Sequence, residues 1–208
     1  MHGKGNTEGR KFVVETHFAK NARTISLTSY QRQLVIGSLL GDGTLMPTTA
    51  GFCFRVHHGI HQSVYVDWKF KALEQYVRSA PRICGNGYYF RTVTHPEFSN
   101  LRELFYPKGL KTAPLRLLEE HLNELGLAIW IMDDGASDGK QLRINSQSFS
   151  VMENEGLIGL LRAKFALDAN LNTDKRRTRL RFTAASMNRL LSLVRPHFLP
   201  SMLYKLPP

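Results

Sequence analysis

The sequence predicts a mixed α+β protein that contains two copies of one arrangement of helices and strands. An apolar, helix-like stretch that ends in Asp-Gly occurs twice, as LVIGSLLGDG at residues 34–43 and as LAIWIMDDG at residues 127–135. Each stretch is followed by strand, helix, strand-pair and helix signals in the same order. Each copy also closes on a lysine, at a nearly equal distance beyond its acid. An ordered set of matches of this kind indicates an internal repeat.

The first copy is predicted to begin with a helix. After it, FCFRVHH alternates apolar and polar side chains as a half-buried strand does. The Gly-Asn-Gly sequence at 85–87 is typical of a hairpin turn. In order, the predicted elements are a helix at 30–42, a strand at 52–58, a helix at 65–77, a hairpin at 82–94 and a helix at 99–105.

The second copy repeats this order. In QLRINSQSF, Leu142 and Ile144 alternate with Arg143 and Asn145, which again indicates a strand with one polar face. The predicted elements are a helix at 125–134, a strand at 141–149, a helix at 152–167, a strand pair at 173–184 and a helix at 186–194. The predicted domains are a loose, polar N-terminal arm at 1–28, a first repeat at 29–124 and a second repeat at 125–208.

The composition indicates a polyanion as the binding partner. The 208 residues carry a formal net charge of +11 and have a sequence pI near 9.9. A strongly basic globular chain most often binds nucleic acid. A basic surface that only keeps the protein soluble is the alternative. With 42% hydrophobic residues, the chain can bury a sizeable core.

Cysteine usage and hydropathy predict a reduced, soluble, intracellular protein, in a bacterial cytoplasm or an organelle. Cys53 and Cys84 are the two cysteines of the sequence. The first 20 residues lack the apolar segment of a signal peptide, and the longest apolar runs are too short to span a membrane. His57, His58 and His61 lie between the cysteines, but paired C-x2-C spacing is missing, so a zinc site is not favoured.

The first motif helix carries a strip of small residues. Gly37 and Gly41 are four positions apart and lie on one helical face, which Ser38 widens. A helix of this kind lets another backbone approach closely, and the equivalent helix of the second copy is the expected partner. Gly43 and Gly135 then fit as helix-ending glycines. Taken singly, an acid followed by glycine is most often only a helix end.

Parallel packing of the two helices would bring Asp42 and Asp134 side by side. The last helical turn also exposes unpaired backbone carbonyls, so the two ends form an oxygen-rich site of negative potential. Two carboxylates in that position repel each other unless a cation sits with them. Mg²⁺ is the expected ion because it prefers octahedral oxygen ligands, and Mn²⁺ is expected to substitute for it. A metal ion between a water molecule and a phosphate is a common means of hydrolysing a phosphodiester.

Arginine, asparagine and glutamine gather on the predicted polar strand faces. Three guanidinium groups, those of Arg177, Arg179 and Arg181, alternate with uncharged residues and share one face. A two-stranded ribbon fits the major groove, where these residue types read base edges. A solvated sheet face is the alternative, but acids are scarce on these strands, which favours DNA. The predicted DNA-contacting residues are Arg55, His57, Arg91, Arg143, Asn145, Gln147, Lys175, Arg177, Arg179 and Arg181.

LVIGSLLGDG and LAIWIMDDG resemble the paired motifs of the LAGLIDADG homing endonucleases, in the two-motif, single-chain branch of that family. The similarity continues through LKTAP, NSQSF and MLYKLP, and covers most of residues 30–208. It implies an αββαββα unit in each repeat, with the motif helices at the centre and two antiparallel sheets that form a DNA-binding saddle. It also implies a monomeric, metal-dependent endodeoxyribonuclease that cuts both strands of a long, non-palindromic site across a narrowed minor groove, leaving short 3′ overhangs.

The resemblance implies roles for individual residues by motif position. Asp134, rather than its neighbour Asp133, matches the catalytic acid because it directly precedes the glycine, as Asp42 does. Lysines at the ends of the repeats would order water or balance the charge that develops on the phosphate. The implied catalytic residues are Asp42, Asp134, Lys111 and Lys205, and the implied metal ligands are the two acids with the carbonyls of Gly41 and Asp133.

The second motif departs from the family pattern. Ile129 and Trp130 stand where a small residue and an aliphatic residue are usual, which makes the pairing of the two helices asymmetric and suits a non-palindromic target. Relatives of this fold also act as intron RNA maturases or as transcription regulators, so intron RNA is an alternative partner. Both acids and both lysines are kept, which favours an enzyme encoded in a mobile intron or standing free.

Overall fold

Two runs of secondary structure share the order helix–strand–strand–helix–strand–strand–helix. The computed structural model describes residues 16–174 and 177–208. The first run comprises α2 (Ser29–Leu40), β1 (Thr44–Thr48), β2 (Gly51–Gly59), α3 (Ser63–Leu73), β3 (Arg82–Cys84), β4 (Gly87–Arg91) and α4 (Pro96–Phe105). The second comprises α6 (Glu124–Asp134), β5 (Gly135–Asp138), β6 (Gln141–Ile144), α7 (Val151–Phe165), β7 (Ala169–Asp174), β8 (Arg177–Phe182) and α8 (Met187–Val194). The predicted two-copy α+β fold is confirmed.

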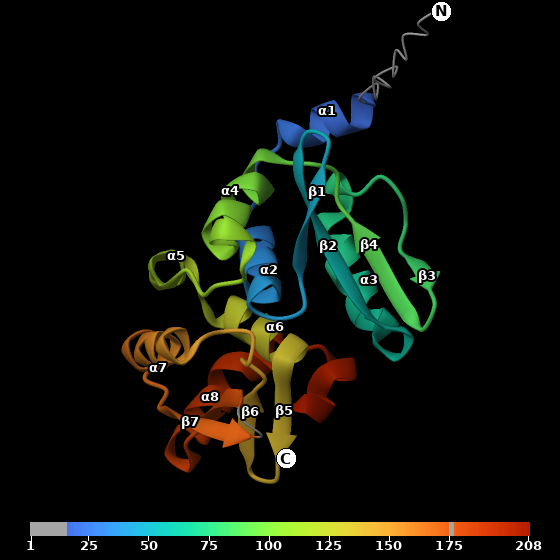
Figure 1. Cartoon of the computed structure of the whole chain (residues 1–208). Helices are drawn as coiled ribbons and strands as arrows, with labels where there is room; N and C mark the ends of the chain where they lie inside the picture. The colour runs from blue at the N-terminus through green and yellow to red at the C-terminus, as the bar shows by residue number, and fades with distance from the viewer. Residues whose placement is uncertain (1–15, 175–176) are drawn as a thin grey trace, which may run out of the picture.

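Each run forms one four-stranded antiparallel sheet. The strand orders are β1-β2-β4-β3 and β5-β6-β8-β7, so the two sheets have the same topology. Their registers also match, because Arg55 pairs with Arg91 on β2 and β4, as Arg143 pairs with Arg181 on β6 and β8. Figure 1 shows the first repeat, from blue to green, on one side and the second, from yellow to red, on the other, with α2 and α6 between them.

The two motif helices pack closely along their small residues. A methyl group added at Gly37 would lie under 3.0 Å from the carbonyl oxygen of Gly126 on α6 and 2.9 Å from Cβ of Ile129. A methyl group added at Gly41 would meet Asp133 in the same way. The predicted close approach of the two helices is therefore confirmed, and no larger side chain fits at these two glycines without moving the partner helix.

Local signals fix where these elements begin. Thr28 and Gln31 form a reciprocal capping box at the start of α2, and Ser150 and Glu153 form one at the start of α7. Each box satisfies backbone N–H groups that the first helical turn leaves unpaired. Asn123 caps α6 through its side-chain oxygen. The two motif helices thus start at defined positions, which sets where their acidic ends fall.

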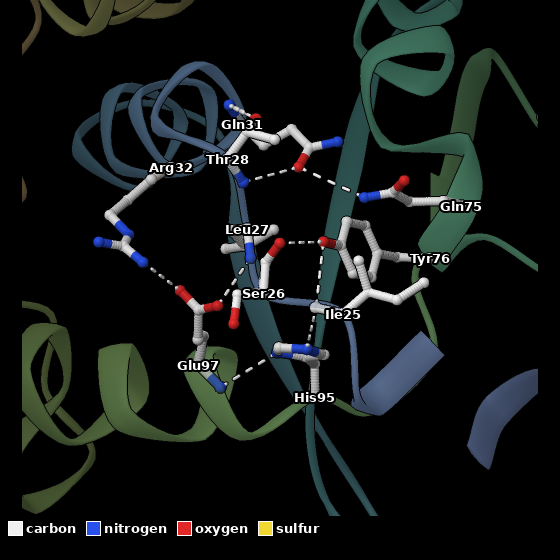
Figure 2. A network of polar contacts seen from close by, with 10 residues as sticks. All are labelled: Ile25, Ser26, Leu27, Thr28, Gln31, Arg32, Gln75, Tyr76, His95 and Glu97. Atoms are coloured by element: carbon white, nitrogen blue, oxygen red, sulfur yellow. Dashed lines mark hydrogen bonds and ion pairs between the residues drawn. The ribbon is translucent and has the colours of Figure 1, made fainter. Parts of the chain in front are cut away.

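The segment before the first repeat is docked rather than loose. It contains α1 (His17–Arg23), and Figure 2 shows the polar contacts that hold the chain after this helix. The Tyr76 hydroxyl donates to the carbonyl of Ile25 at 3.2 Å, and Glu97 accepts from the backbone N–H of Leu27 at 2.8 Å. The expectation of a loose arm is wrong for this segment, and residues 1–15 lie outside those described.

Several boundaries differ from the prediction. Strand β6 stops at Ile144, and the chain then turns, with the backbone N–H of Ser146 donating to the carbonyl of Ile144. Strand β1 was not predicted, and its Pro47 is a residue that occurs in sheets mainly on edge strands such as this one. Helix α5 (Leu115–His121), which joins the repeats, was not predicted either. Across the described part of the chain, no helix is long and apolar enough to cross a membrane.

Candidate active site and DNA-binding faces

The C-terminal ends of α2 and α6 place Asp42 close enough to Asp134 for its charge to raise the pKa of Asp134. The backbone N–H of Asp42 donates to Oδ2 of Asp133 at 3.3 Å, which ties the two helix ends together. Burial raises the pKa of Asp134 to about 7, with further contributions from the negative charges of Asp42 and Asp133. Burial and the charge of Asp133 also raise the pKa of Asp42. The predicted electronegative pair of acids is present.

Each acid has a lysine at the carbonyl that precedes it. Lys111, just after the 3₁₀ turn Pro107–Gly109, donates from Nζ to the carbonyl of Gly41 at 2.6 Å. Lys205, in the 3₁₀ helix Pro200–Lys205, donates from Nζ to the carbonyl of Asp133 at 2.5 Å. Burial lowers the pKa of both lysines, and the surrounding acids oppose that shift. The four residues assigned to catalysis thus meet at one place, related by the pseudo-symmetry of the repeats.

The donor set of this site suits a hard divalent cation. Within residues 16–174 and 177–208, no three acidic, histidine or cysteine side chains are grouped as a metal site, so a cation at this site would need backbone carbonyls as well as carboxylates. Two carboxylates and two carbonyl oxygens remain, all of them oxygen donors. Burial, and after it the negative charges of Asp42 and Asp133, raise the pKa of Asp134, and a bound cation would oppose both effects by stabilising the carboxylate. Each carbonyl oxygen has two lone pairs, so it can accept from its lysine and still face a cation.

A buried ion-pair network lies beneath the acids, and the sequence reasoning missed it. Asp133 is fully buried, and its Oδ1 accepts from the Tyr65 hydroxyl at 2.7 Å and from Lys69 Nζ at 2.8 Å. Burial opposes ionisation, but the Lys69 ammonium and the nearby His58 hold the pKa of Asp133 below its ordinary value. These contacts join helix α3 of the first repeat to helix α6 of the second.

His58 completes this network on the side of Asp42. Its side chain is 2% exposed, with Nδ1 3.5 Å from Oδ2 of Asp42 and Nε2 3.8 Å from Oδ1 of Asp133. Burial and the nearby Lys69 charge lower the pKa of His58 to about 4, so the imidazole is neutral at physiological pH. Two sequence signals were available: His58 is in register with the apolar face of its strand, and Lys69 is in register with the buried Tyr65 of its helix.

The first sheet gathers cationic and aromatic side chains on one face. Directly opposed residues of antiparallel strands share a face, so Arg55 and Arg91 lie together. On the same face His57 is opposite Tyr89, which in turn is opposite Arg82. The guanidinium groups of Arg55 and Arg82 lie 5.0 Å and 5.3 Å from the centre of the Tyr89 ring. Tyr89 and Arg82 are additions to the predicted set.

The second sheet presents a comparable face, although the predicted residues do not all lie on it. Arg143 and Arg181 face each other across β6 and β8, and Arg179 lies two positions from Arg181 on the same side of β8. Asn145 and Gln147 lie in the loop after β6 rather than on a strand. Strand β8 begins at Arg177, whose side chain is outside the described set, and Lys175 lies outside the described residues altogether.

An acid occurs on this second face, contrary to the expected scarcity. Oδ2 of Asp138, at the end of β5, lies 3.5 Å from a terminal nitrogen of Arg143 and 3.2 Å from one of Arg181. All three side chains are partly exposed, so the ion pairs are accessible to solvent. Asp138 therefore orients two of the predicted DNA-contacting arginines and offsets part of their charge.

Comparison with known proteins identifies the family. The model of the LAGLIDADG DNA endonuclease family matches residues 32–190. The chain is 36% identical to probable intron-encoded DNA endonuclease 3 of Mycosarcoma maydis over 126 residues, which cover 58% of this chain and 93% of that protein. It is 38% identical to intron-encoded endonuclease ai4 of Dictyostelium discoideum over 121 residues, which cover 57% of this chain and 76% of that protein.

A solved structure has the same fold. The homing endonuclease I-WcaI, bound to its DNA recognition sequence, superposes with a TM-score of 0.84 over 93% of each chain at 24% sequence identity. The family match spans both Asp-Gly motifs and both sheets. The chain therefore belongs to the LAGLIDADG DNA endonuclease family. Membership explains both the two pseudo-symmetric repeats and the paired acids at the ends of their central helices.

Proposed function

We propose that this endonuclease hydrolyses one phosphodiester bond in each strand of a long, non-palindromic DNA site, as a monomer and with Mg²⁺ as its usual metal. The observation that carries the proposal is the duplicated arrangement of an acid with a lysine at the preceding carbonyl. Two such half-sites in one chain match the two scissile bonds of a duplex. The two basic sheet faces, one in each repeat, would bind the two halves of the target.

The residues of each half-site divide the chemical work. Asp42 and Asp134, with the carbonyls of Gly41 and Asp133, would hold the divalent cation. A bound divalent cation lowers the pKa of a water molecule and offsets the negative charge of the phosphate. Lys111 and Lys205 keep an ammonium group beside each acid, where it can orient water and stabilise the charge that develops on the phosphate. Partial burial strengthens these interactions because it lowers the local dielectric constant.

The nature of the metal is supported by solved relatives. I-DmoI variants have been solved in complex with their target DNA in the presence of Mn and of Mg. Those proteins share the fold with this chain at 12% and 11% sequence identity. The all-oxygen donor set described above suits both ions, so we expect Mn²⁺ to replace Mg²⁺ in this chain.

An RNA maturase or a non-catalytic DNA-binding regulator on the same fold is the competing proposal. Either function would need the basic surfaces but not the acids. Both acids and both lysines are retained here, and they are held together by buried contacts. This retention favours cleavage.

The test is cleavage of a duplex that spans the insertion site of the coding sequence, with and without Mg²⁺. We expect Asp42→Asn and Asp134→Asn to abolish double-strand cleavage while site-specific binding is largely kept, because the sheet faces supply the binding. Asp168→Asn, which alters a surface ion pair with Arg162, is the matched control and should cleave normally. Normal cleavage by either active-site variant would remove that acid from the mechanism.

A further inference from the structure

The two halves of the active site differ in the residues behind their acids. The motifs align Asp42 with Asp134, and therefore Gly41 with Asp133. The matching registers of the two sheets align Arg55 with Arg143, so Ser146 is the counterpart of His58 by sequence, three positions later, although it lies beyond the end of β6. The pseudo-symmetry that relates the acids thus does not extend to the groups that support them.

In the first repeat, His58 lies between two carboxylates. Oδ1 of Asp133 already accepts from Tyr65 and Lys69, so it needs no further donor. The one N–H of a neutral imidazole is then best placed on Nδ1, which faces Oδ2 of Asp42 at 3.5 Å. The side chain of Asp42 is 49% exposed, so its other oxygen stays accessible on the solvent side.

Packing fixes the imidazole in this position. The ring centre of His58 lies 5.1 Å from that of Tyr65, which stacks in turn on Trp68 at 5.9 Å. The Lys69 ammonium lies 4.3 Å from the centre of the Tyr65 ring. A side chain that is 2% exposed and in contact with the buried Tyr65 ring has little freedom to turn away from Asp42.

In the second repeat, the equivalent residue serves its own repeat. Ser146 is fully buried, and its hydroxyl accepts from the backbone N–H of Leu180 at 3.2 Å. Its carbonyl accepts from the side chain of Asn154 at 3.3 Å. Among the residues that the structure describes, no basic side chain forms an ion-pair contact with the carboxylate of Asp134 like the 3.5 Å contact between His58 and Asp42. The two acids therefore differ in the groups that contact them on the protein side.

We propose that His58 is a positioning residue for Asp42, and that cleavage of one DNA strand depends on it while cleavage of the other does not. The inference rests on the proposed cleavage function. The imidazole contacts one oxygen of Asp42, and this contact would set the direction of the other oxygen, which would be free to hold the cation. Asp134 has no such constraint, so the two strands should respond differently to a change at His58.

Three substitutions separate the two contacts of the imidazole. His58→Leu removes both of them. His58→Asn keeps an amide N–H near the place of Nδ1, facing Asp42, whereas His58→Gln places its amide near Nε2, facing Asp133. We expect His58→Leu to slow cleavage of one strand about 10-fold relative to the other, the size expected for loss of one polar contact to a carboxylate. His58→Asn should restore the strand ratio to within about 3-fold of wild type, and His58→Gln should not.

The measurement uses a duplex of the target labelled separately on each strand, at saturating protein and Mg²⁺. Ser146→Ala is the matched control, because it removes a buried hydrogen bond at the equivalent position and should leave the strand ratio unchanged. A second readout does not need cleavage. Mn²⁺ is titrated into the protein bound to an uncleavable duplex, and the electron spin resonance signal measures the free Mn²⁺. His58→Leu should weaken the binding of one Mn²⁺ ion, and His58→Asn should bind Mn²⁺ as wild type does.

The outcomes distinguish this inference from the proposed function. If wild type cuts both strands and His58→Leu slows both equally, or neither, His58 does not position Asp42 and the inference is wrong. Equal restoration by the Asn and Gln variants would likewise reduce His58 to a packing role. If wild type cuts no strand, the proposed function fails. In that case unchanged Mn²⁺ binding by His58→Leu would overturn the inference separately, and selective weakening of one ion would support it.

Discussion

Replacing Gly37 by alanine should destabilise the protein, although alanine is the better helix former. In an exposed helix interior, alanine is favoured over glycine by about 1 kcal/mol. At Gly37 the added methyl would lie under 3.0 Å from the backbone carbonyl oxygen of Gly126 and 2.9 Å from Cβ of Ile129. A backbone carbonyl in a packed helix cannot turn aside, so α2 and α6 must separate. Overpacking of this kind costs up to about 3 kcal/mol, which leaves a net loss of about 2 kcal/mol.

A second glycine provides the control. Gly159, in the interior of α7, has nothing within 4 Å of an added methyl group. Gly159→Ala should therefore stabilise the protein by about 0.5–1 kcal/mol, because only the helix preference changes. Urea denaturation of the two variants and wild type measures both free energies of unfolding, provided the slope with urea stays constant. If Gly37→Ala is as stable as wild type, or shifts in the same direction as Gly159→Ala, the close packing of the motif helices is wrong.

Three further predictions concern the buried charges. Lys69→Met leaves the Asp133 carboxylate buried without its ammonium and should lower the free energy of unfolding by about 3–5 kcal/mol in urea denaturation; a loss under about 1 kcal/mol would show that the pair is solvated. Lys111→Met and Lys205→Met should keep DNA affinity but accumulate nicked intermediates on opposite strands of a supercoiled target; equal cutting rates for wild type and both variants at saturation would remove the lysines from catalysis. The pKa of Asp134 is raised to about 7 without metal, so Mn²⁺ binding should release a proton below pH 7 and none well above it. Calorimetry in buffers of different ionisation enthalpy measures this release. If no proton is released at pH 6, Asp134 is not protonated there in the free protein.

The repeat and its acids were predictable because their signals are local in the sequence. Alternation of apolar side chains predicts a strand, and small residues four apart predict close helix packing, without knowledge of distant residues. The Asp-Gly ends and the lysines recur at nearly fixed distances, so the order of the elements was enough to bring them together. The boundaries that were wrong involve tertiary contacts. Strand β6 ends early because the chain turns at Ser146, whose hydroxyl accepts from the backbone N–H of Leu180 on β8.

The contacts that His58, Tyr65 and Lys69 make with Asp42 and Asp133 were not predictable in the same way. His58 is in register with Phe54 and Val56, so the alternation along β2 places it on the buried face. The sequence does not show its partners, because these come from α3 and from the ends of α2 and α6. Lys69 did carry a usable signal, since it lies four residues from Tyr65 and four from Leu73 on a helix face that is otherwise buried and apolar. A charge in that register requires a buried partner of opposite sign.

The asymmetry behind the acids follows from the packing of the motif helices themselves. The space where a Gly41 side chain would lie is filled by Cβ and the carboxylate of Asp133. An aspartate at both positions would crowd the contact between the helices and bury two like charges together, so one helix end must carry glycine where the other carries the acid. That single acid recruits Lys69, Tyr65 and His58 from the first repeat only. A chain with two fused repeats can therefore give one catalytic acid a support that the other lacks, which a symmetric dimer of identical repeats could not do.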